Sequence, residues 1–524
     1  MIRPLRVMTW NVNGLRAVLQ RLQKSLKQFL DDLDADIICL QETKLTRSEL
    51  DEELVRPPGS SLMLTDAPGT GYDAFYTFCR IRGGYSGVVT FCKSEIPTVA
   101  AEEGLTGFWP IADSVGCIGT VHKELSTKDL TDLESEGRSV VTDHQAFVLV
   151  NVYCPALASS ERLEFKMHFH ALLQDRVLAL RAAGRHVVVV GDINVAHRAI
   201  DHCNPGPCEG TAFEDQPHRQ WMNGFVIAQD EEHHTVEEDV SLDTEPRREK
   251  LVDTFRHFHP SETKAFTCWN TLTGARQTNY GTRIDYVLVD SAYVGALLLS
   301  RPFALQIELT DVWLCSIEPS RLGSDHCPVV MDAVVQLADD PWTTAALCAK
   351  NYAEFAGTQQ SIAAFLTLGS EGVVADQCHT PLKTAIVRRP STSQSKVGQR
   401  SITSFFTPST PVPSKMMNAR IDGTGYTNST SSSSSSVFFK AVTSTSSKRK
   451  AVEEWQSVLS GRPPPTPNCY CGQPTVLRSV VKINENWGRK FFVCTKPAGE
   501  KGHPDARCEF FQWADKRPAK RNKQ

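Results

Sequence analysis

The chain lacks any run of apolar residues long enough to cross a membrane. A spanning helix needs about 20 consecutive, mostly apolar residues, and no window of the 524 residues approaches that composition. The first residues, MIRPLRVMTWN, lack the continuous apolar segment of a secretory signal. We therefore expect a protein with no membrane partner and no secretory route, while the short basic start leaves mitochondrial import open.

The chain also lacks the regular cysteine spacing of a disulfide framework. Its 16 cysteines are scattered, mostly without regular spacing, and several, such as Cys39 and Cys327, lie within apolar runs. That usage is typical of cytosolic or nuclear proteins, in which thiols stay reduced.

A strong charge of one sign is missing as well, but the small net charge conceals two oppositely charged parts. Residues 462–524 carry 13 Lys or Arg and 5 Asp or Glu, a net charge of +8, so the rest must carry −12 to give the total of −4. A basic tail favours contact with nucleic acid, and an acidic body can recruit cations. With 524 residues, 41% of them hydrophobic, the chain can hold several domains and a large core.

The most informative stretch is HVVVVGDINVAH, residues 186–197. Its four β-branched valines are too few for a globular helix and are closed by Gly191, so they predict a buried strand. Asp192 and Asn194 follow directly. A carboxylate there can bind a metal or take a proton, and an amide two residues on can bind a phosphoryl oxygen. An Asx turn that simply closes the strand is the alternative.

The same pattern recurs along the body of the chain. The other predicted strands span residues 5–10, 36–40, 84–91, 146–152, 283–289 and 326–330. The spacing of apolar residues predicts helices over residues 15–33 and 163–180. Helices alternate with strands in the first half and strands dominate later, which favours an α/β fold of two packed sheets flanked by helices.

The polar residues at the strand ends suit one chemistry. They are Asn11, Glu42, Tyr153, Asp192, Asn194, Asp285, Asp325 and His326. Each alone has an ordinary structural explanation, such as a solvated helix start or a core aromatic ring. Together, these residue types are those that metal-assisted phosphodiester hydrolysis requires. A hard cation such as Mg²⁺ prefers carboxylate and amide oxygens, and Glu42 is the best candidate ligand.

Six motifs follow the order found in the endonuclease/exonuclease/phosphatase superfamily. They are WNVNGLR, LQETK, NVYCP, GDINVAH, RIDYVL and GSDHCPV. The chain from about Leu5 to Val334 thus resembles this superfamily, and most closely its exonuclease III type of apurinic/apyrimidinic (AP) endonuclease. The resemblance implies a four-layered α/β sandwich as the catalytic domain, residues 1–347. It also implies Mg²⁺ as the catalytic cofactor, with Mn²⁺ left open.

The resemblance implies a role for each site residue. The implied metal ligands are Glu42, as the main one, and Asn11, Asp192, Asn194, Asp325 and His326. In catalysis, His326 oriented by Asp285 would polarise the scissile phosphate or activate water. Asp192 would activate the nucleophile, and Asn194 would position the substrate. Tyr153 would support the phosphate or the leaving group.

The chain departs from the major AP endonucleases at several motifs. Those enzymes carry an Asp where this chain has Asn13, which weakens a second metal position. They have aromatic residues where this chain has Thr282 and Cys268, so Trp269 and Asn279 are the remaining candidates for an AP-site pocket. A pocket with fewer aromatic walls should bind an extruded abasic sugar less well. We therefore expect mainly 3′→5′ exonuclease and 3′-phosphodiesterase activity, with slow AP-site incision.

Beyond the body, Ser, Thr and Pro dominate, so residues 348–467 are predicted to form a disordered linker. Residues 399–406 within it have the form Q-x-x-I-x-x-F-F. The residues that define this form are Gln399, Ile402, Phe405 and Phe406. An exposed apolar cluster needs a partner, and this one looks like the motif by which repair enzymes bind the sliding clamp PCNA. Residues 359–366 resemble it more loosely, and an ordinary helical turn is the better interpretation there.

Four thiols lie in a tail that is too small to build a stable core without a structural metal or a disulfide. They are Cys469, Cys471, Cys494 and Cys508, and they predict a tetrahedral site for a structural Zn²⁺. With its flanking residues, the segment 468–513 resembles the GRF-type zinc finger, and a basic tail, residues 514–524, follows it. Basic residues there can contact phosphates, and aromatic ones can stack on unpaired bases. The candidates are Arg489, Lys490, Phe491, Arg507 and Trp513.

Nuclease, clamp motif and GRF finger together resemble the type 2 branch of the AP endonucleases. The resemblance implies a monomeric nuclease of base excision repair in the nucleus, with cytoplasm and mitochondrion left open. It would act on 3′ ends and AP sites and be recruited by PCNA and single-stranded DNA. Two alternatives stay open: a clamp- and DNA-binding scaffold whose nuclease has decayed, and an inositol-phosphate phosphatase of the same fold. The retained Glu42, Asp192, Asp285 and His326 argue against decay.

Overall fold

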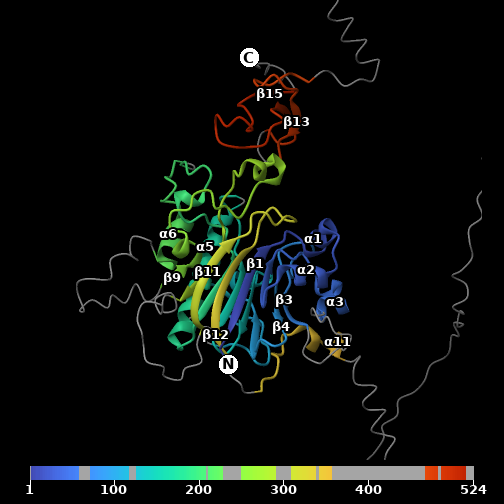
Figure 1. Ribbon diagram of the computed structural model, residues 1–524, viewed down its shortest axis with the longest axis vertical. Helices are drawn as coiled ribbons and strands as arrows, with labels where there is room; N and C mark the ends of the chain where they lie inside the picture. Colours follow the sequence, from blue (N-terminus) through green and yellow to red (C-terminus); the bar gives the residue numbers. More distant parts are fainter. Residues whose placement is uncertain are drawn as a thin grey trace, which may run out of the picture. The chain divides into compact units, whose positions relative to one another are not determined.

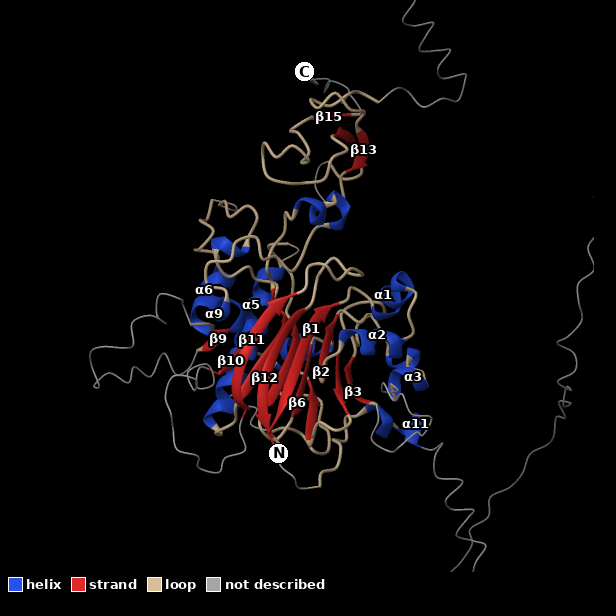
Figure 2. Ribbon diagram, in the orientation of Figure 1, coloured by secondary structure: helices blue, strands red, loops and turns tan. Residues whose placement is uncertain are grey.

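A computed structural model describes residues 2–57, 71–116, 125–157, 159–207, 210–227, 250–290, 309–337, 341–356, 466–481 and 486–514. The body of the chain is built on two six-stranded sheets (Figures 1 and 2). The first sheet has the order β11 (Leu309–Ile317), β12 (Val329–Gln336), β1 (Ile2–Asn11), β2 (Ile37–Gln41), β4 (Val88–Lys93) and β3 (Tyr72–Thr77). The second has the order β5 (Ala100–Glu103), β6 (Ser139–Asp143), β7 (Val148–Tyr153), β8 (Val187–Asp192), β10 (Asp285–Asp290) and β9 (Leu251–Asp253).

Helices cover the outer faces of both sheets (Figure 2). The helices beside the first sheet are α1 (Leu15–Leu22), α2 (Leu26–Leu33), α3 (Glu52–Val55) and α11 (Ala353–Ala356). Those beside the second are α4 (Thr127–Ser135), α5 (Arg162–Ala182) and α6 (Pro217–Phe225). The short helix α9 (Thr254–Phe258) instead packs against both β11 and β10, and its Phe255 joins the core between the sheets. Short 3₁₀ turns are η1 (Arg47–Glu49), η2 (Ala199–Asp201), η3 (Thr271–Thr273), η4 (Ala275–Thr278) and η5 (Ala349–Asn351).

The cores follow from the two-residue alternation of side chains along the strands. In β1, Val7 packs into the cluster between the two sheets, whereas Met8 packs outward against α1 and α2. In β8, Val190 faces the other sheet and Val189 faces α5. Helix, sheet, sheet and helix therefore form four layers, and the predicted four-layered α/β sandwich is confirmed.

The single helix predicted over residues 15–33 is wrong, because the structure has two helices there. Gln23 ends α1 in the left-handed conformation, with φ +55°. Ser25 then begins α2 by accepting a hydrogen bond from Gln28 N and completing a capping box. Apolar periodicity continues across the break, so these local cap interactions decided against one continuous helix.

The packed body continues past Leu347. Cys348 is fully buried and forms a β-bridge with Phe75. Lys350 Nζ donates to Asp73 Oδ1 at 2.6 Å, and Tyr352 is buried. The described part of the body thus ends at residue 356. The predicted clamp motif, residues 399–406, lies outside the described residues, as do residues 359–366 and the basic tail from residue 515 onwards.

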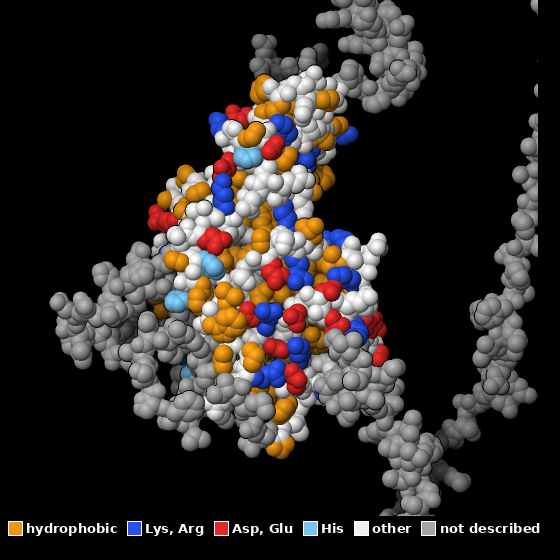
Figure 3. Space-filling view, in the orientation of Figure 1, with side chains coloured by type: hydrophobic (Ala, Val, Ile, Leu, Met, Phe, Trp, Pro, Cys, Tyr) orange, Lys and Arg blue, Asp and Glu red, His pale blue; other side chains and the backbone are white. Residues whose placement is uncertain are grey.

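The finger segment forms a separate three-stranded antiparallel sheet. Its strands are β13 (Val476–Ser479), β14 (Lys490–Val493) and β15 (Phe511–Trp513). Among the described residues, no helix combines the length and the apolar character needed to cross a bilayer. On the face of the body shown in Figure 3, basic and acidic side chains are interspersed over the described residues and form no single basic surface.

Candidate active site

The sheet pairing brings the predicted strand-end residues to one edge. In the first sheet, β1 and β2 are parallel, and Asn11 is paired with Gln41, the residue before Glu42. In the second sheet, β7 and β8 are parallel, and Tyr153 is paired with Asp192. Since the carboxyl ends of parallel strands meet at the same edge, each sheet delivers polar side chains to the same crevice.

The backbone is unusual at two of these strand ends. Gly191 has φ +132°, and a Cβ there would lie 2.0 Å from Val152 O, so only glycine lets β8 approach β7 this closely before Asp192. Glu42 adopts φ +50°, a conformation that costs energy for a residue other than glycine. Backbone strain of this kind concentrates at functional sites, where the surrounding structure holds it in place.

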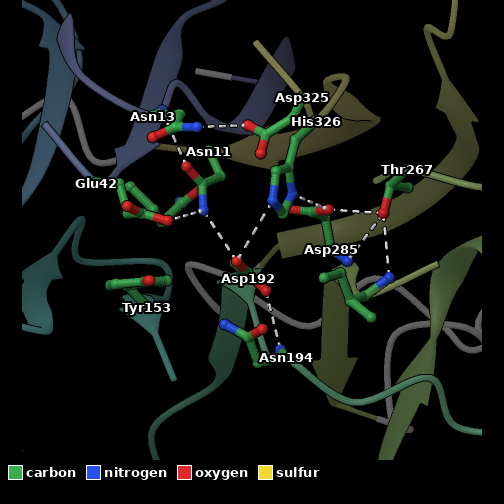
Figure 4. Close-up of polar contacts among 12 residues, drawn as sticks. Asn11, Asn13, Glu42, Tyr153, Asp192, Asn194, Thr267, Asp285, Asp325 and His326 are labelled. Carbon is green, nitrogen blue, oxygen red and sulfur yellow. Dashed lines mark hydrogen bonds and ion pairs between the residues drawn. The ribbon is translucent and has the colours of Figure 1, made fainter. Parts of the chain in front are cut away.

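The Asn11 amide joins the two sheets within the site (Figure 4). Its Nδ2 donates to Glu42 Oε1 at 3.1 Å and to Asp192 Oδ2 at 2.9 Å. Asn11 and Asp192 are almost completely buried. Two carboxylates from different sheets are thus held around one amide, with Glu42 the more exposed of the pair.

A second chain of polar contacts leads from Asp192 to a histidine and its partner (Figure 4). His326 Nε2 lies 3.9 Å from Asp192 Oδ2, and His326 Nδ1 lies 2.8 Å from Asp285 Oδ2. The same Asp285 oxygen accepts the Thr267 hydroxyl at 2.6 Å. The contact with Asp285 fixes the orientation of the His326 ring.

Burial and neighbouring charge perturb both titratable ends of this chain. Burial, followed by the charge of Asp285, raises the pKa of Asp192 to about 7. Burial is the largest influence and lowers the pKa of His326, but the charges of Asp285 and Cys268 and the hydrogen bonds to them together outweigh it and raise that pKa well above the ordinary value. A crowded, buried set of carboxylates is stabilised by a cation, and perturbed values of this kind mark functional sites.

The donor set fits a hard divalent cation. Ligand atoms of Asp192, Asp285 and His326 all lie within 4.8 Å of one another. Glu42 reaches the same crevice through Asn11. Oxygen donors predominate in this set, as Mg²⁺ prefers.

The remaining predicted ligands, Asp325 and Asn194, lie on either side of the group formed by Asn11, Asp192 and His326 (Figure 4). Asp325 Oδ1 accepts from Asn13 Nδ2 at 2.9 Å. Asn194 N donates to Asp192 Oδ1 at 2.9 Å, and its side-chain amide donates to Cys154 O. Asn13 therefore acts as a hydrogen-bond donor where a second carboxylate would add negative charge.

The four finger cysteines also gather. Their sulfur atoms all lie within 4.8 Å of one another, and the sulfurs of Cys469 and Cys494 are 3.6 Å apart. Cys494 directly follows β14 and Cys508 lies just before β15, so both lie at the end of the sheet where Val493 pairs with Val476 and Phe511, the end that also carries the turn with Cys469 and Cys471. Four thiols at this spacing suit a tetrahedral structural Zn²⁺.

Comparison with known proteins agrees with both sites. Residues 8–326 match the Endonuclease/Exonuclease/phosphatase family, and residues 467–517 match the GRF zinc finger. The chain belongs to the endonuclease/exonuclease/phosphatase family.

Several vertebrate proteins are similar to this chain over nearly the whole length of both sequences. The human protein named DNA-(apurinic or apyrimidinic site) endonuclease 2 is 37% identical, over 97% of this chain and 99% of the human one. The Xenopus laevis protein of that name is 36% identical, over 98% of this chain and 99% of the relative. The crystal structure of the Xenopus laevis APE2 catalytic domain matches with a TM-score of 0.53 and 39% identity, covering 68% of this chain and 100% of that one.

Sequence reasoning missed Arg138, which contacts the predicted site residue Tyr153. Its guanidinium lies 4.6 Å from the centre of the Tyr153 ring and donates to Tyr153 O at 3.0 Å. Burial raises the pKa of Tyr153 well above its ordinary value, so the phenol keeps its proton. Arg138, Arg82 and Arg162 line a cavity of about 560 Å³ beside Tyr153. No local sequence pattern predicts that these three arginines lie together beside Tyr153.

The backbone of Trp269 adjoins the predicted metal ligands, since its N donates to Asp325 O at 2.9 Å, whereas the side chains of Trp269 and Asn279 line a separate cavity. Trp269 is buried, and its Nε1 donates to Asn279 Oδ1 at 3.0 Å. Both line a cavity of about 520 Å³ whose other walls include Phe255 and His259 and none of the predicted metal ligands. The residue opposite His326 in the β-bridge is Cys268, and neither Trp269 nor Asn279 occupies that position.

Proposed function

We propose that this chain is a Mg²⁺-dependent DNA repair nuclease that hydrolyses DNA phosphodiesters, as its type 2 AP endonuclease relatives are named to do. One observation carries the proposal: Asn11 links Glu42 to Asp192, and Asp192 continues to His326 and Asp285. A bound Mg²⁺ would polarise the phosphoryl oxygens and lower the pKa of a bound water. Glu42, Asp192, Asn11, Asn194 and Asp325 are the residues that would hold it.

Other side chains are proposed to orient the phosphate and to transfer protons during hydrolysis. Asp285 fixes the His326 ring so that Nε2 faces the crevice, where a protonated ring can donate to a phosphate oxygen. Asp192, with its pKa raised to about 7 by burial, can take the proton of an attacking water near neutral pH. Tyr153, a protonated phenol beside Glu42, can donate to the leaving oxygen or to the phosphate.

We propose that 3′ ends, rather than internal AP sites, are the main substrates. Thr282 and Cys268 stand side by side in a β-bridge, and Cys268 is paired with His326 on its other side. Small side chains therefore occupy positions next to the catalytic histidine where a wall for an extruded sugar would stand. Trp269 is buried, and the Arg276 guanidinium lies 4.5 Å from the centre of its ring, so one of its stacking faces is already covered. A site with so little aromatic surface gains little from base or sugar extrusion.

The finger is proposed to bind single-stranded DNA that leads to the 3′ end. Phe491 stacks on Phe511, with ring centroids 5.2 Å apart, and Phe511 is 51% exposed. The Arg489 guanidinium lies 3.7 Å from the centre of the Trp513 ring. Lys490 is exposed on the same strand as Phe491. Aromatic faces beside cationic groups suit stacked bases and their phosphates.

We also propose that the chain is recruited by PCNA, which would bind the motif formed by Gln399, Ile402, Phe405 and Phe406. The same proposal places the protein in the nucleus as a monomer. The support is the Q-x-x-I-x-x-F-F pattern and the joining of a nuclease to a DNA-binding finger in one chain. A pull-down with PCNA tests it. Replacing Phe405 and Phe406 by Ala should abolish capture, and undiminished capture would refute the assignment.

A single set of substrates tests the catalytic proposal. Recessed, 3′-blocked and AP-site DNAs, together with an inositol polyphosphate, are incubated with wild-type protein, Glu42→Gln and Asp192→Asn. We expect DNA cleavage to fall about 100-fold or more in both variants, since each removes a charge from the metal site. Glu354→Gln is the matched control, because Glu354 is an exposed carboxylate paired with Arg47. Full activity in Asp192→Asn would refute the mechanism, and cleavage of the inositol phosphate alone would favour a phosphatase.

A further inference from the structure

Arg276 donates hydrogen bonds to three backbone carbonyls of one loop beside the active site. The loop is residues 318–328, which connect β11 to β12. Arg276 Nη1 donates to Ser324 O at 2.9 Å. Its Nη2 donates to Pro319 O at 2.8 Å and to Arg321 O at 2.7 Å. A guanidinium presents its N–H donors in a fixed planar fork, so this one side chain fixes the three carbonyls relative to one another.

The last of these carbonyls belongs to the residue directly before two predicted site residues. Ser324 Oγ donates to Asn11 O at 2.7 Å and lies 3.1 Å from Asp325 Oδ1. The same oxygen accepts a hydrogen bond from His326 N at 3.2 Å. The position of Ser324 therefore decides where Asp325 and His326 stand relative to Asn11, and Arg276 holds the carbonyl of that residue.

Other contacts tie the loop to α1 and α2. Gly323 adopts φ +128°, and a Cβ there would lie 2.8 Å from Val18 Cγ2, so a glycine is needed where the loop meets α1. Arg321 Nη1 donates to Asp32 O of α2 at 3.1 Å. These contacts do not involve Arg276, so removing its guanidinium should loosen the loop without detaching it from α1 and α2.

Arg276 itself is well placed to hold the loop. Its guanidinium lies 4.5 Å from the centre of the Trp269 ring, and Trp269 N donates to Asp325 O at 2.9 Å. The cavity of about 520 Å³ is lined by Arg276, Trp269 and Pro319 among other residues. A small cation can therefore reach the position of the guanidinium when the arginine side chain is removed.

We propose that Arg276 is a positioning residue for phosphodiester hydrolysis, which holds the loop so that Asp325 and His326 meet the other metal-site residues. The inference deepens the proposed nuclease function and rests on it for its kinetic readout. A displacement approaching 1 Å in a catalytic group lowers the rate about 100-fold. Loss of the fork should therefore lower kcat and raise the half-saturating Mg²⁺ concentration. The KM for DNA should change little, because the finger that is proposed to bind DNA is unaltered.

The kinetic test uses the full chain with its finger loaded with zinc. Cleavage of a recessed DNA end is measured during Mg²⁺ titrations of wild-type protein, Arg276→Ala and Arg276→Lys. We expect kcat to fall about 10- to 100-fold in Arg276→Ala, with a KM for DNA near the wild-type value. Arg276→Lys should recover only part of the loss, because an ammonium group is a point charge without the planar fork.

Chemical rescue separates the role of the fork from a general loss of stability. Guanidinium, added far below denaturing concentrations, should raise the kcat of Arg276→Ala, whereas ammonium at the same concentration should not. Arg56→Ala is the matched control, because Arg56 is also partly buried and donates to a backbone carbonyl, Phe355 O at 3.2 Å. It should keep the wild-type kcat and show no response to guanidinium.

Amide hydrogen exchange keeps this inference separate from the nuclease proposal. Residues 318–327 should exchange faster in Arg276→Ala than in wild-type protein and Arg56→Ala. Wild-type kcat and Mg²⁺ half-saturation in Arg276→Ala, full activity in Arg276→Lys, or equal rescue by ammonium would overturn the positioning role. If wild-type protein cleaves no DNA at all, the nuclease proposal fails, and unchanged exchange in Arg276→Ala would then refute the hold on the loop. Should Arg276→Ala not fold, the same measurements on Arg276→Gln give the decision.

Discussion

A buried hydrogen bond behind the active site holds the two sheets in register. Gln41 Nε2 donates to Asn151 Oδ1 at 2.7 Å and to Thr9 Oγ1 at 2.9 Å. Asn151 Nδ2 crosses back to Val89 O at 2.9 Å and to Thr90 Oγ1 at 3.1 Å. Gln41 precedes Glu42 in the first sheet, and Asn151 lies two residues before Tyr153 in the second. Asn151→Ala removes every one of these contacts between the sheets.

The expected cost has a structural part and a catalytic part. Asn151 makes three hydrogen bonds and is fully buried. A net loss of about 1 kcal/mol for each bond, more where a buried partner is left unpaired, gives roughly 2–4 kcal/mol of destabilisation. Glu42 and Asp192 lie on opposite sheets, so a small shift between the sheets changes the metal site. A displacement approaching 1 Å lowers kcat about 100-fold, so we expect a fall of about 10- to 100-fold and a higher half-saturating Mg²⁺ concentration.

The matched control is Thr142→Ala. Thr142 Oγ1 lies 2.9 Å from His144 Nε2, is fully buried, and sits in the second sheet at the end of β6 and β7 away from Tyr153. Urea unfolding gives the stability of both variants, and Mg²⁺ titrations of DNA cleavage give kcat and half-saturation. The control should lose stability without a change in Mg²⁺ dependence. If Asn151→Ala is destabilised and yet keeps the wild-type kcat and Mg²⁺ half-saturation, the sheets do not need this contact to position the site.

Three further predictions follow from single contacts. Asp285→Asn should lower single-turnover cleavage about 100- to 10,000-fold and move the alkaline limb of the pH–rate profile to lower pH, because the Asp285 charge raises the pKa of His326; an unchanged profile would contradict this. Burial lowers the pKa of Lys166 from 10.5 to about 8, so the unfolded chain binds more protons between these values and stability rises with pH. Between pH 8 and 10 the free energy of unfolding should therefore increase by about 2 kcal/mol more in wild-type protein than in Lys166→Met, and parallel curves would count against it. Removing zinc with a zinc-selective chelator, or Cys494→Ser, should abolish single-stranded DNA binding while cleavage of short duplex ends at saturating Mg²⁺ persists; binding that survives zinc removal would show that the finger fold does not depend on the metal.

The strand-end residues were predictable because short-range rules place them. A run of valines closed by Gly191 predicts a strand, and parallel strands end at one edge, so Asp192 and Glu42 were expected in one crevice. The break between α1 and α2 was not predicted, because the Ser25 cap competes with a periodicity that continues through it. Local rules therefore located the chemistry more reliably than they located the ends of the helices.

By itself, the sequence determined the layered α/β class, the carboxylate and histidine set and the four zinc-binding thiols, since each is written in a short motif. Only the tertiary structure decided which residues face one another across the sheets: Cys268 with His326, Arg138 with Tyr153, and Gln41 with Asn151. The physical reason is that sheet pairing and sheet packing join residues far apart in the chain, and a two-residue alternation specifies the face of a strand but not its neighbour.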